Sequence, residues 1–155
     1  PEAVLEPLSE HLNDYEQLMM QYYGAGVQAC YRGPRLYDTE TTRQMVAKTI
    51  LWYKKYRNIL NADMIQLRRA DGRDWDGWMH VNPALAQKGL MMLFNPTQVP
   101  ITRTISLPLY YTGLSKTAII KDAKGISKTY TLNRDYTINF TFTIAADSYS
   151  WFLIE

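Results

Sequence analysis

The periodicity of the sequence changes near residue 63, and this change constrains the fold more than any other feature. Downstream of it, apolar and β-branched side chains fall into short segments separated by turn signals such as Asp71-Gly72 and Thr112-Gly113. The candidate strands are Met64–Arg69, Trp78–Val81, Gly89–Phe94, Thr102–Leu107, Thr117–Lys121, Ser127–Leu132, Thr137–Phe142 and Ser148–Ile154. Strands of this length and spacing are typical of an antiparallel β-sandwich. The sequence therefore predicts a sandwich domain over residues 63–155.

Two of these segments also indicate where they lie in the sandwich. Residues 139–143 alternate polar and apolar side chains, which is the pattern of an antiparallel strand with one face in the core. The run from Leu90 to Phe94 is apolar throughout, so we expect it at the centre of a sheet and covered on both faces.

Residues 1–62 carry a helical pattern instead. A helix is predicted over residues 9–22, with a serine as its cap and apolar side chains at steps of three and four. A second, longer helix is predicted to begin after Asp38 or Thr39 and to run to about Leu60. Its broad apolar face, opposite lysine and arginine side chains, indicates a helix that packs on one side.

A short apolar segment, Ala25–Cys30, separates the two helices and is predicted to be a single buried strand. The order helix, strand, helix is that of the end of an α/β unit, and a lone parallel strand needs neighbours to pair with. We therefore predict an α+β chain, in which two N-terminal helices with a short strand precede a sandwich of about eight strands. We also expect residues 1–62 to belong to a domain that continues upstream.

Charge and cysteine content exclude several classes of function. Lys and Arg number 17 against 15 Asp and Glu, and the basic residues are dispersed, so nothing favours nucleic-acid binding. The single cysteine, Cys30, excludes an intrachain disulfide. No apolar run approaches the roughly 18 residues that a membrane-spanning helix needs. Neither nucleic acid nor a membrane is therefore an expected partner.

An acidic loop holds Asp71, Asp74 and Asp76 within six residues. Three carboxylates so close together could hold Ca²⁺, but their spacing departs from the calcium-loop pattern. The favoured interpretation is a hairpin loop whose aspartates cap the turn and pair with Arg68, Arg69 or Arg73. A glycosidase carboxylate pair needs a sugar-sized cleft, and the tip of a hairpin offers none.

No other motif for catalysis or for a cofactor is present. The sequence has two histidines, His11 and His80, and no Cys/His cluster with metal-ligand spacing. The sequence also lacks a phosphate-binding loop, a dinucleotide fingerprint and a nucleophile elbow. We expect no catalytic residue, no resident metal and no cofactor in this chain.

Four aromatic side chains near turns are a candidate for carbohydrate binding. Trp75 and Trp78 flank the acidic loop, and Tyr110 and Tyr111 precede a turn. Aromatic side chains with nearby polar groups can stack on sugar rings, although most tryptophans and tyrosines serve in packing. Packing is the favoured interpretation, and sugar stacking remains the alternative.

A second candidate is the loop that carries Tyr31, Arg32 and Arg35. It follows a candidate strand and precedes a long helix, which in an α/β barrel is the mouth of the active site. Arginines there could bind hydroxyls or carboxylates. Equally, they could pair with Asp38 or Glu40, and position alone does not decide between the two interpretations.

Several stretches of the sequence resemble the C-terminal end of melibiase-like α-galactosidases, a group of glycoside hydrolases. These stretches are YGAGVQACYRGPRLYDT at 23–39, WYKKYRNIL at 52–60, LRRADGRDWDGWMHVNP at 67–83 and KGLMMLFNPTQVPITRTISLPLYYTGL at 88–114. In such enzymes a catalytic (β/α)₈ barrel precedes an antiparallel β-sandwich. The resemblance implies that residues 1–62 are the helical end of the barrel with its linker helix, and that 63–155 are the sandwich.

The same resemblance assigns roles within the intact parent enzyme. Val27–Cys30 would be the last barrel strand, and Tyr31, Arg32 and Arg35 would lie at the rim of the sugar pocket. The catalytic carboxylates of a retaining hydrolase would lie upstream, outside this chain. The resemblance thus implies two partners, the upstream barrel of the same polypeptide and a carbohydrate, and it suggests export to the periplasm or the cell exterior.

The resulting expectation is a non-catalytic, structurally supporting C-terminal portion of a glycoside hydrolase. One alternative is a carbohydrate-binding module that uses Trp75, Trp78, Tyr110 or Tyr111. Another is a homodimer formed through helix faces that would otherwise contact the barrel.

Overall fold

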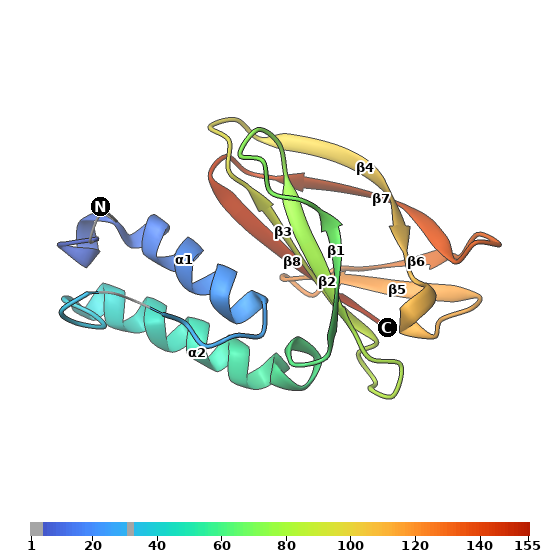
Figure 1. Ribbon diagram of the computed structural model, residues 1–155, viewed down its shortest axis with the longest axis horizontal. Helices are drawn as coiled ribbons and strands as arrows, with labels where there is room; N and C mark the ends of the chain where they lie inside the picture. The colour runs from blue at the N-terminus through green and yellow to red at the C-terminus, as the bar shows by residue number, and fades with distance from the viewer. Residues whose placement is uncertain (1–4, 31–32) are drawn as a thin grey trace. The chain divides into compact units, whose positions relative to one another are not determined.

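The computed structural model describes residues 5–30 and 33–155 of the chain (Figure 1). The chain divides into two units, residues 1–61 and 62–155. The first unit contains the short 3₁₀ helix η1 (Leu8–Glu10) and the helices α1 (Leu12–Gly24) and α2 (Glu40–Leu60). The second unit contains eight antiparallel strands, so the predicted α+β class is confirmed.

The helices of the first unit pack on a small apolar core of their own. Its buried members come from η1, α1 and α2: Leu8, Tyr15, Met19, Met45 and Val46. The Tyr15 hydroxyl also donates a 2.8 Å hydrogen bond to the carbonyl of Leu36, which ties α1 to the segment before α2. Among the described residues, no helix has the length and apolar character to cross a membrane.

The start of α2 is fixed by a dense polar cluster. Thr39 is the N-cap, and it exchanges hydrogen bonds with Thr42 in a capping box, so one of the two predicted caps is confirmed. The Asp38 carboxylate accepts hydrogen bonds from the N–H and the hydroxyl of Ser9, at 2.9 and 3.0 Å, and from the Thr42 hydroxyl at 2.8 Å. Asp38 therefore joins the segment before α1 to the first turn of α2.

The prediction of a strand over Ala25–Cys30 is wrong. Helix α1 ends at Gly24, Gly26 adopts a left-handed φ of 72°, and the segment that follows has no regular structure. Val27 is half exposed instead of buried. The described part of this unit contains no strand that could pair with the segment, and unpaired backbone groups favour solvent over a buried extended conformation.

The second unit is a sandwich of two sheets, and Figure 1 shows β4 and β7 as a layer separate from the larger sheet. The larger sheet has the strand order β1-β2-β3-β8-β5-β6, and the smaller one pairs β4 with β7. All eight predicted strands are present: β1 Asp63–Arg68, β2 Asp76–Val81, β3 Gly89–Asn95, β4 Ile101–Pro108, β5 Thr117–Asp122, β6 Ser127–Thr131, β7 Thr137–Ile144 and β8 Ser148–Ile154.

One apolar core fills the space between the two sheets. From β7 it takes every second residue, Ile138, Phe140, Phe142 and Ile144, which confirms the alternation predicted around 139–143. Strand β3 lies centrally between β2 and β8, and all seven of its residues are buried, as its continuous apolar run predicts. The turn after β3 is fastened by the buried Asn95, whose amide donates to the carbonyls of Val99, Ile144 and Ala145.

The Asp38 cluster predicts acid sensitivity in the first unit. Partial loss of solvent acts to raise the pKa of Asp38, but the hydrogen bonds from Ser9 and Thr42 outweigh it and lower the pKa from 3.8 to about 2. Because the folded-state pKa lies below the unfolded value, ionised Asp38 stabilises the fold at neutral pH. That contribution is lost as the pH falls from about 4 to about 2.

We therefore expect Asp38→Asn to reduce the stability difference between about pH 5 and about pH 2, measured by urea unfolding followed by far-ultraviolet circular dichroism. Asp14→Asn is the matched control, since that exposed carboxylate takes no part in the start of α2. An unchanged pH dependence in Asp38→Asn would contradict the assignment.

Candidate functional site

Of the loop predicted to line a barrel mouth, only Arg35 can be placed. Tyr31 and Arg32 lie outside the described residues. Arg35 is largely exposed, and its Nε lies 3.3 Å from an Oε of Glu6. Of the two interpretations left open for this loop, the pairing of Arg35 with Asp38 or Glu40 is therefore not the one observed.

Both expected acidic partners of Arg35 are engaged elsewhere. Asp38 bonds Ser9 and Thr42, as described above. Glu40 forms two 2.8 Å hydrogen bonds with Arg43, one turn further along α2. This local pair at a spacing of three residues brings the side chains together through the helix itself, whereas Arg35 would have to fold back from the loop.

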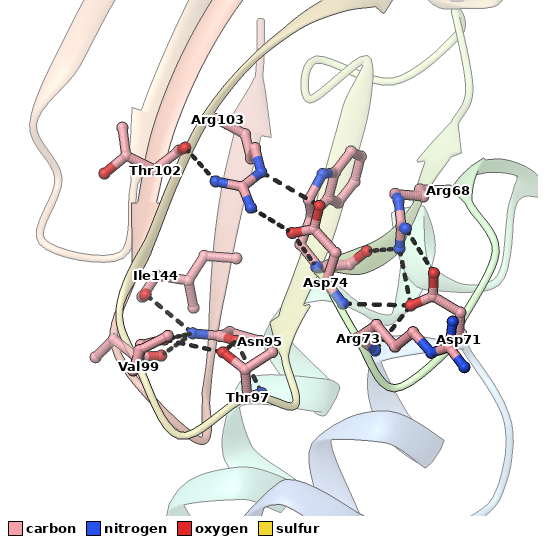
Figure 2. A network of polar contacts seen from close by, with 12 residues as sticks. Arg68, Asp71, Arg73, Asp74, Asn95, Thr97, Val99, Thr102, Arg103 and Ile144 are labelled. Carbon is pink, nitrogen blue, oxygen red and sulfur yellow. Dashed lines mark hydrogen bonds and ion pairs between the residues drawn. The ribbon is translucent and has the colours of Figure 1, made fainter.

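The acidic loop forms a network of turn caps and ion pairs, shown in Figure 2. Asp71 accepts hydrogen bonds from the Arg68 guanidinium, at 2.7 Å for the shorter, and from the N–H groups of Arg73 and Asp74. The Arg68 guanidinium also donates to the carbonyl of Trp75. The predicted turn-capping role of this loop, with Arg68 as partner, is thus confirmed.

Asp74 connects this loop to the other sheet. It accepts a 2.8 Å hydrogen bond from the Trp75 N–H, and Nε and an Nη of Arg103 lie 3.2 and 3.1 Å from its two oxygens (Figure 2). Arg103 belongs to β4, whereas Asp74 precedes β2. The pair therefore bridges the two layers of the sandwich at the margin of the core.

The pKa values of the three carboxylates, Asp71, Asp74 and Asp76, are shifted in different directions. The hydrogen bond from Arg68 is the largest cause that holds the pKa of Asp71 far below its usual range. At Asp74, loss of solvent raises the pKa, but the Trp75 N–H and Arg103 outweigh it. At Asp76, burial raises the pKa. Within residues 5–30 and 33–155, no group of three or more potential ligands is arranged to hold a metal ion.

The two tryptophans predicted as possible sugar platforms serve in packing. Trp75 is buried, its ring lies edge-on to Phe142 at 5.2 Å, and the Arg68 guanidinium lies 6.0 Å from its centre. Trp78 is half-buried and packs on Phe94 at 5.1 Å. A buried ring presents no face to a dissolved ligand, so Trp75 does not belong to a solvent-facing platform.

The two tyrosines, by contrast, are open to solvent. Tyr110 and Tyr111 are 61% and 63% exposed, and they occupy the short helix η2 (Tyr110–Thr112) after β4. The flanking Leu109 and Thr112 are fully buried, and the Thr112 hydroxyl donates a 2.6 Å hydrogen bond to the Leu109 carbonyl. The turn is thus anchored on both sides, which leaves the two phenol rings on the surface.

A third tyrosine, not predicted from the sequence, completes this cluster. The ring of Tyr136 lies 5.4 Å from that of Tyr110, which in turn lies 5.2 Å from Tyr111, and both contacts are edge-to-face. Tyr136 has a φ of 63°, a left-handed conformation that costs a bulky residue roughly 1–2 kcal/mol. The turn between β6 and β7 therefore holds a strained residue at the point where its ring packs on Tyr110.

Tyr111 also lines a cavity of about 340 Å³ in the same unit. The other lining residues are Asp63 and Ile65 of β1, Val81 of β2, and Pro83 just after it. The Pro83 carbonyl accepts a 2.7 Å hydrogen bond from Lys88 Nζ, which fixes this wall of the cavity. Asp63 and Ile65 face the same side of β1, because alternate residues of a strand do so.

The polar groups of this cavity are available to a ligand. Across the described residues, neither the carboxylate of Asp63 nor the hydroxyl of Tyr111 has a hydrogen-bond or ion-pair partner. The site therefore combines a hydrogen-bond acceptor, apolar walls and an exposed aromatic ring. That combination suits a small molecule with both hydroxyl groups and an apolar face.

Known proteins were compared with the chain by sequence and by structure. No family model and no curated protein matches the sequence. Among solved structures, a β-L-arabinopyranosidase of glycoside hydrolase family 27 from Geobacillus stearothermophilus superposes with a TM-score of 0.60 at 11% identity. α-Galactosidase I from Mortierella vinacea gives 0.60 at 13%, and an α-amylase from Geobacillus thermoleovorans gives 0.58 at 10%.

The likeness covers most of this chain and a minor part of each enzyme. It extends over 92%, 97% and 91% of the chain, but over 30%, 38% and 33% of the three enzymes in the same order. At these identities the likeness establishes the fold. The chain therefore folds like a part of α-galactosidase-like glycoside hydrolases, which confirms the predicted resemblance at the level of fold.

The close approach of Gly113 to the cavity wall predicts that a side chain at this position will lower the stability of the sandwich. This residue ends η2 with a φ of 77°, and a Cβ there would lie 3.0 Å from Cβ of Pro83. Gly113→Ala should destabilise the sandwich by about 1–2 kcal/mol, because alanine is strained in the left-handed conformation. The close contact of the new Cβ with Pro83 should add to this loss. Urea unfolding measures the total.

Gly125→Ala is the matched control. Gly125 has a φ of 84°, but a Cβ there would meet nothing within 4 Å. We expect Gly113→Ala to cost more than Gly125→Ala, and equal losses would show that Pro83 is not tightly placed against this turn.

Proposed function

We propose that this chain is a non-catalytic portion of a carbohydrate-active glycoside hydrolase. A catalytic barrel elsewhere in the same polypeptide performs the hydrolysis, and the β-sandwich supports it. The observation that carries the proposal is the fold likeness to three glycoside hydrolases, of whose length the chain spans about a third.

The acidic loop supports a non-catalytic role. A general acid needs a pKa raised towards neutrality, and a nucleophile needs an accessible carboxylate. The pKa values of Asp71 and Asp74 are lowered, and both side chains are occupied by arginines and backbone N–H groups. Asp76 has a raised pKa, but its two acidic neighbours are not available as the second carboxylate of a pair.

Exposed apolar side chains in the first unit support a partner that this chain lacks. Val27, Leu36 and Leu51 are all exposed, and Leu51 is 65% exposed on α2. Helices that cover a barrel present such side chains to it. The helical unit therefore suits a role as the end of a larger α/β domain.

The isolated chain should not hydrolyse glycosides. Chromogenic aryl α-galactosides, β-L-arabinopyranosides and α-glucosides serve as substrates, chosen from the activities named for the three enzymes. We expect rates equal to those of buffer. Saturable hydrolysis that is lost in Asp76→Asn would overturn the proposal, because the activity would then belong to this chain rather than to a contaminant.

A further inference from the structure

We propose that the cavity between β1 and η2 binds one neutral sugar ring, with Tyr111 as its stacking surface and Asp63 as its hydrogen-bond acceptor. The inference goes beyond the proposed function, because supporting a catalytic barrel requires no ligand site in the sandwich.

The stacking surface comes from Tyr111. Its ring is exposed and lines the cavity, while Tyr110 packs against it edge-to-face at 5.2 Å. Tyr136 packs against Tyr110 in turn, and the backbone of Tyr136 adopts a strained left-handed conformation. Rings held by one another lose little freedom when a ligand arrives, and strained residues concentrate at binding sites.

The hydrogen-bond acceptor comes from Asp63. Its carboxylate lines the cavity and has no partner in the part of the chain that the structure describes. Two carboxylate oxygens can accept hydrogen bonds from two neighbouring hydroxyl groups of a sugar. The hydroxyl groups at the edge of the sugar ring would thus bond Asp63, and the apolar face of the sugar ring would stack on Tyr111.

The remaining walls are apolar and fixed. Ile65 and Val81 come from adjacent strands, and Pro83 is held by the 2.7 Å hydrogen bond from Lys88 to its carbonyl. The Asn82 side chain also accepts a 3.0 Å hydrogen bond from the Ala84 N–H, which fixes the same loop. Such a site is largely formed before the ligand binds.

The charge and the size of the cavity select the ligand class. Among the described residues that line it, Asp63 is the only charged one, so a uronic acid or a phosphorylated sugar would be repelled. A volume of about 340 Å³ is at the small end of ligand pockets, which suits one ring rather than an oligosaccharide. A cage for an organic cation needs several aromatic faces, and Tyr111 is the only aromatic residue among the described residues that line this cavity.

The test is a titration of the full chain with methyl α-D-galactopyranoside, methyl β-L-arabinopyranoside and methyl α-D-glucopyranoside, followed by the aromatic proton resonances of its tyrosines. We expect saturable shifts with a dissociation constant of about 1 mM for at least one of them, as for a single small subsite. Sorbitol, which has hydroxyl groups but no ring face, should give no saturable shift.

Three variants locate the site. Tyr111→Ala should weaken binding at least tenfold, Tyr111→Phe should bind within about twofold of the wild type, and Asp63→Asn should weaken binding several-fold. Tyr37→Ala is the matched control, because Tyr37 is an exposed tyrosine of the other unit, with 50% of its surface exposed against 63% for Tyr111. It should bind as the wild type does.

Three outcomes would overturn the inference. One is the absence of saturation by all three glycosides up to roughly 50 mM, where a millimolar site would be filled. Another is binding that Tyr111→Ala leaves unchanged while Tyr111→Ala remains folded. The third is saturable binding of choline in place of the sugars, which would show a cation site. The hydrolysis assay fails or succeeds independently of these results, so the two proposals are separable.

Discussion

The interleaved apolar core between the two sheets is the constraint on which the rest of the sandwich depends. Alternate residues of β7 enter it from one layer, and Met91 and Leu93 of β3 enter it from the other. On β1, which pairs with β2, Ile65 packs against this core. Asp63 lies two residues earlier on the same face of the strand, at the edge of the core. The candidate sugar site is therefore the place where this core meets solvent.

The carboxylates show how position decides the role of a side chain. Asp71 and Asp74 hold the β1–β2 loop in place. Asp71 pairs with Arg68, and Asp74 pairs with Arg103 of the other layer. Asp38 does the same for the start of α2. Asp63, at the end of an edge strand, has no hydrogen-bond or ion-pair partner among the described residues, so its carboxylate can accept hydrogen bonds from a ligand.

Local features could be predicted from the sequence, and features that depend on distant residues could not. Turn signals and alternation located all eight strands, and the Thr39 cap followed from residues within one helical turn. The segment Ala25–Cys30 is apolar but has no strand to pair with, so its composition was misleading. The contact between Asp74 and Arg103 joins residues 29 positions apart, which no local pattern indicates. The left-handed φ of Tyr136 could not be predicted either, because tyrosine is not a residue type that favours this conformation.

The proposal that this chain is one portion of a larger glycoside hydrolase is tested most directly by determining the open reading frame that encodes it. We expect an in-frame segment upstream of Pro1 of the order of 200–250 residues, with alternating strand and helix patterns. A stop codon directly upstream, or an in-frame segment too short for such a barrel, would contradict it.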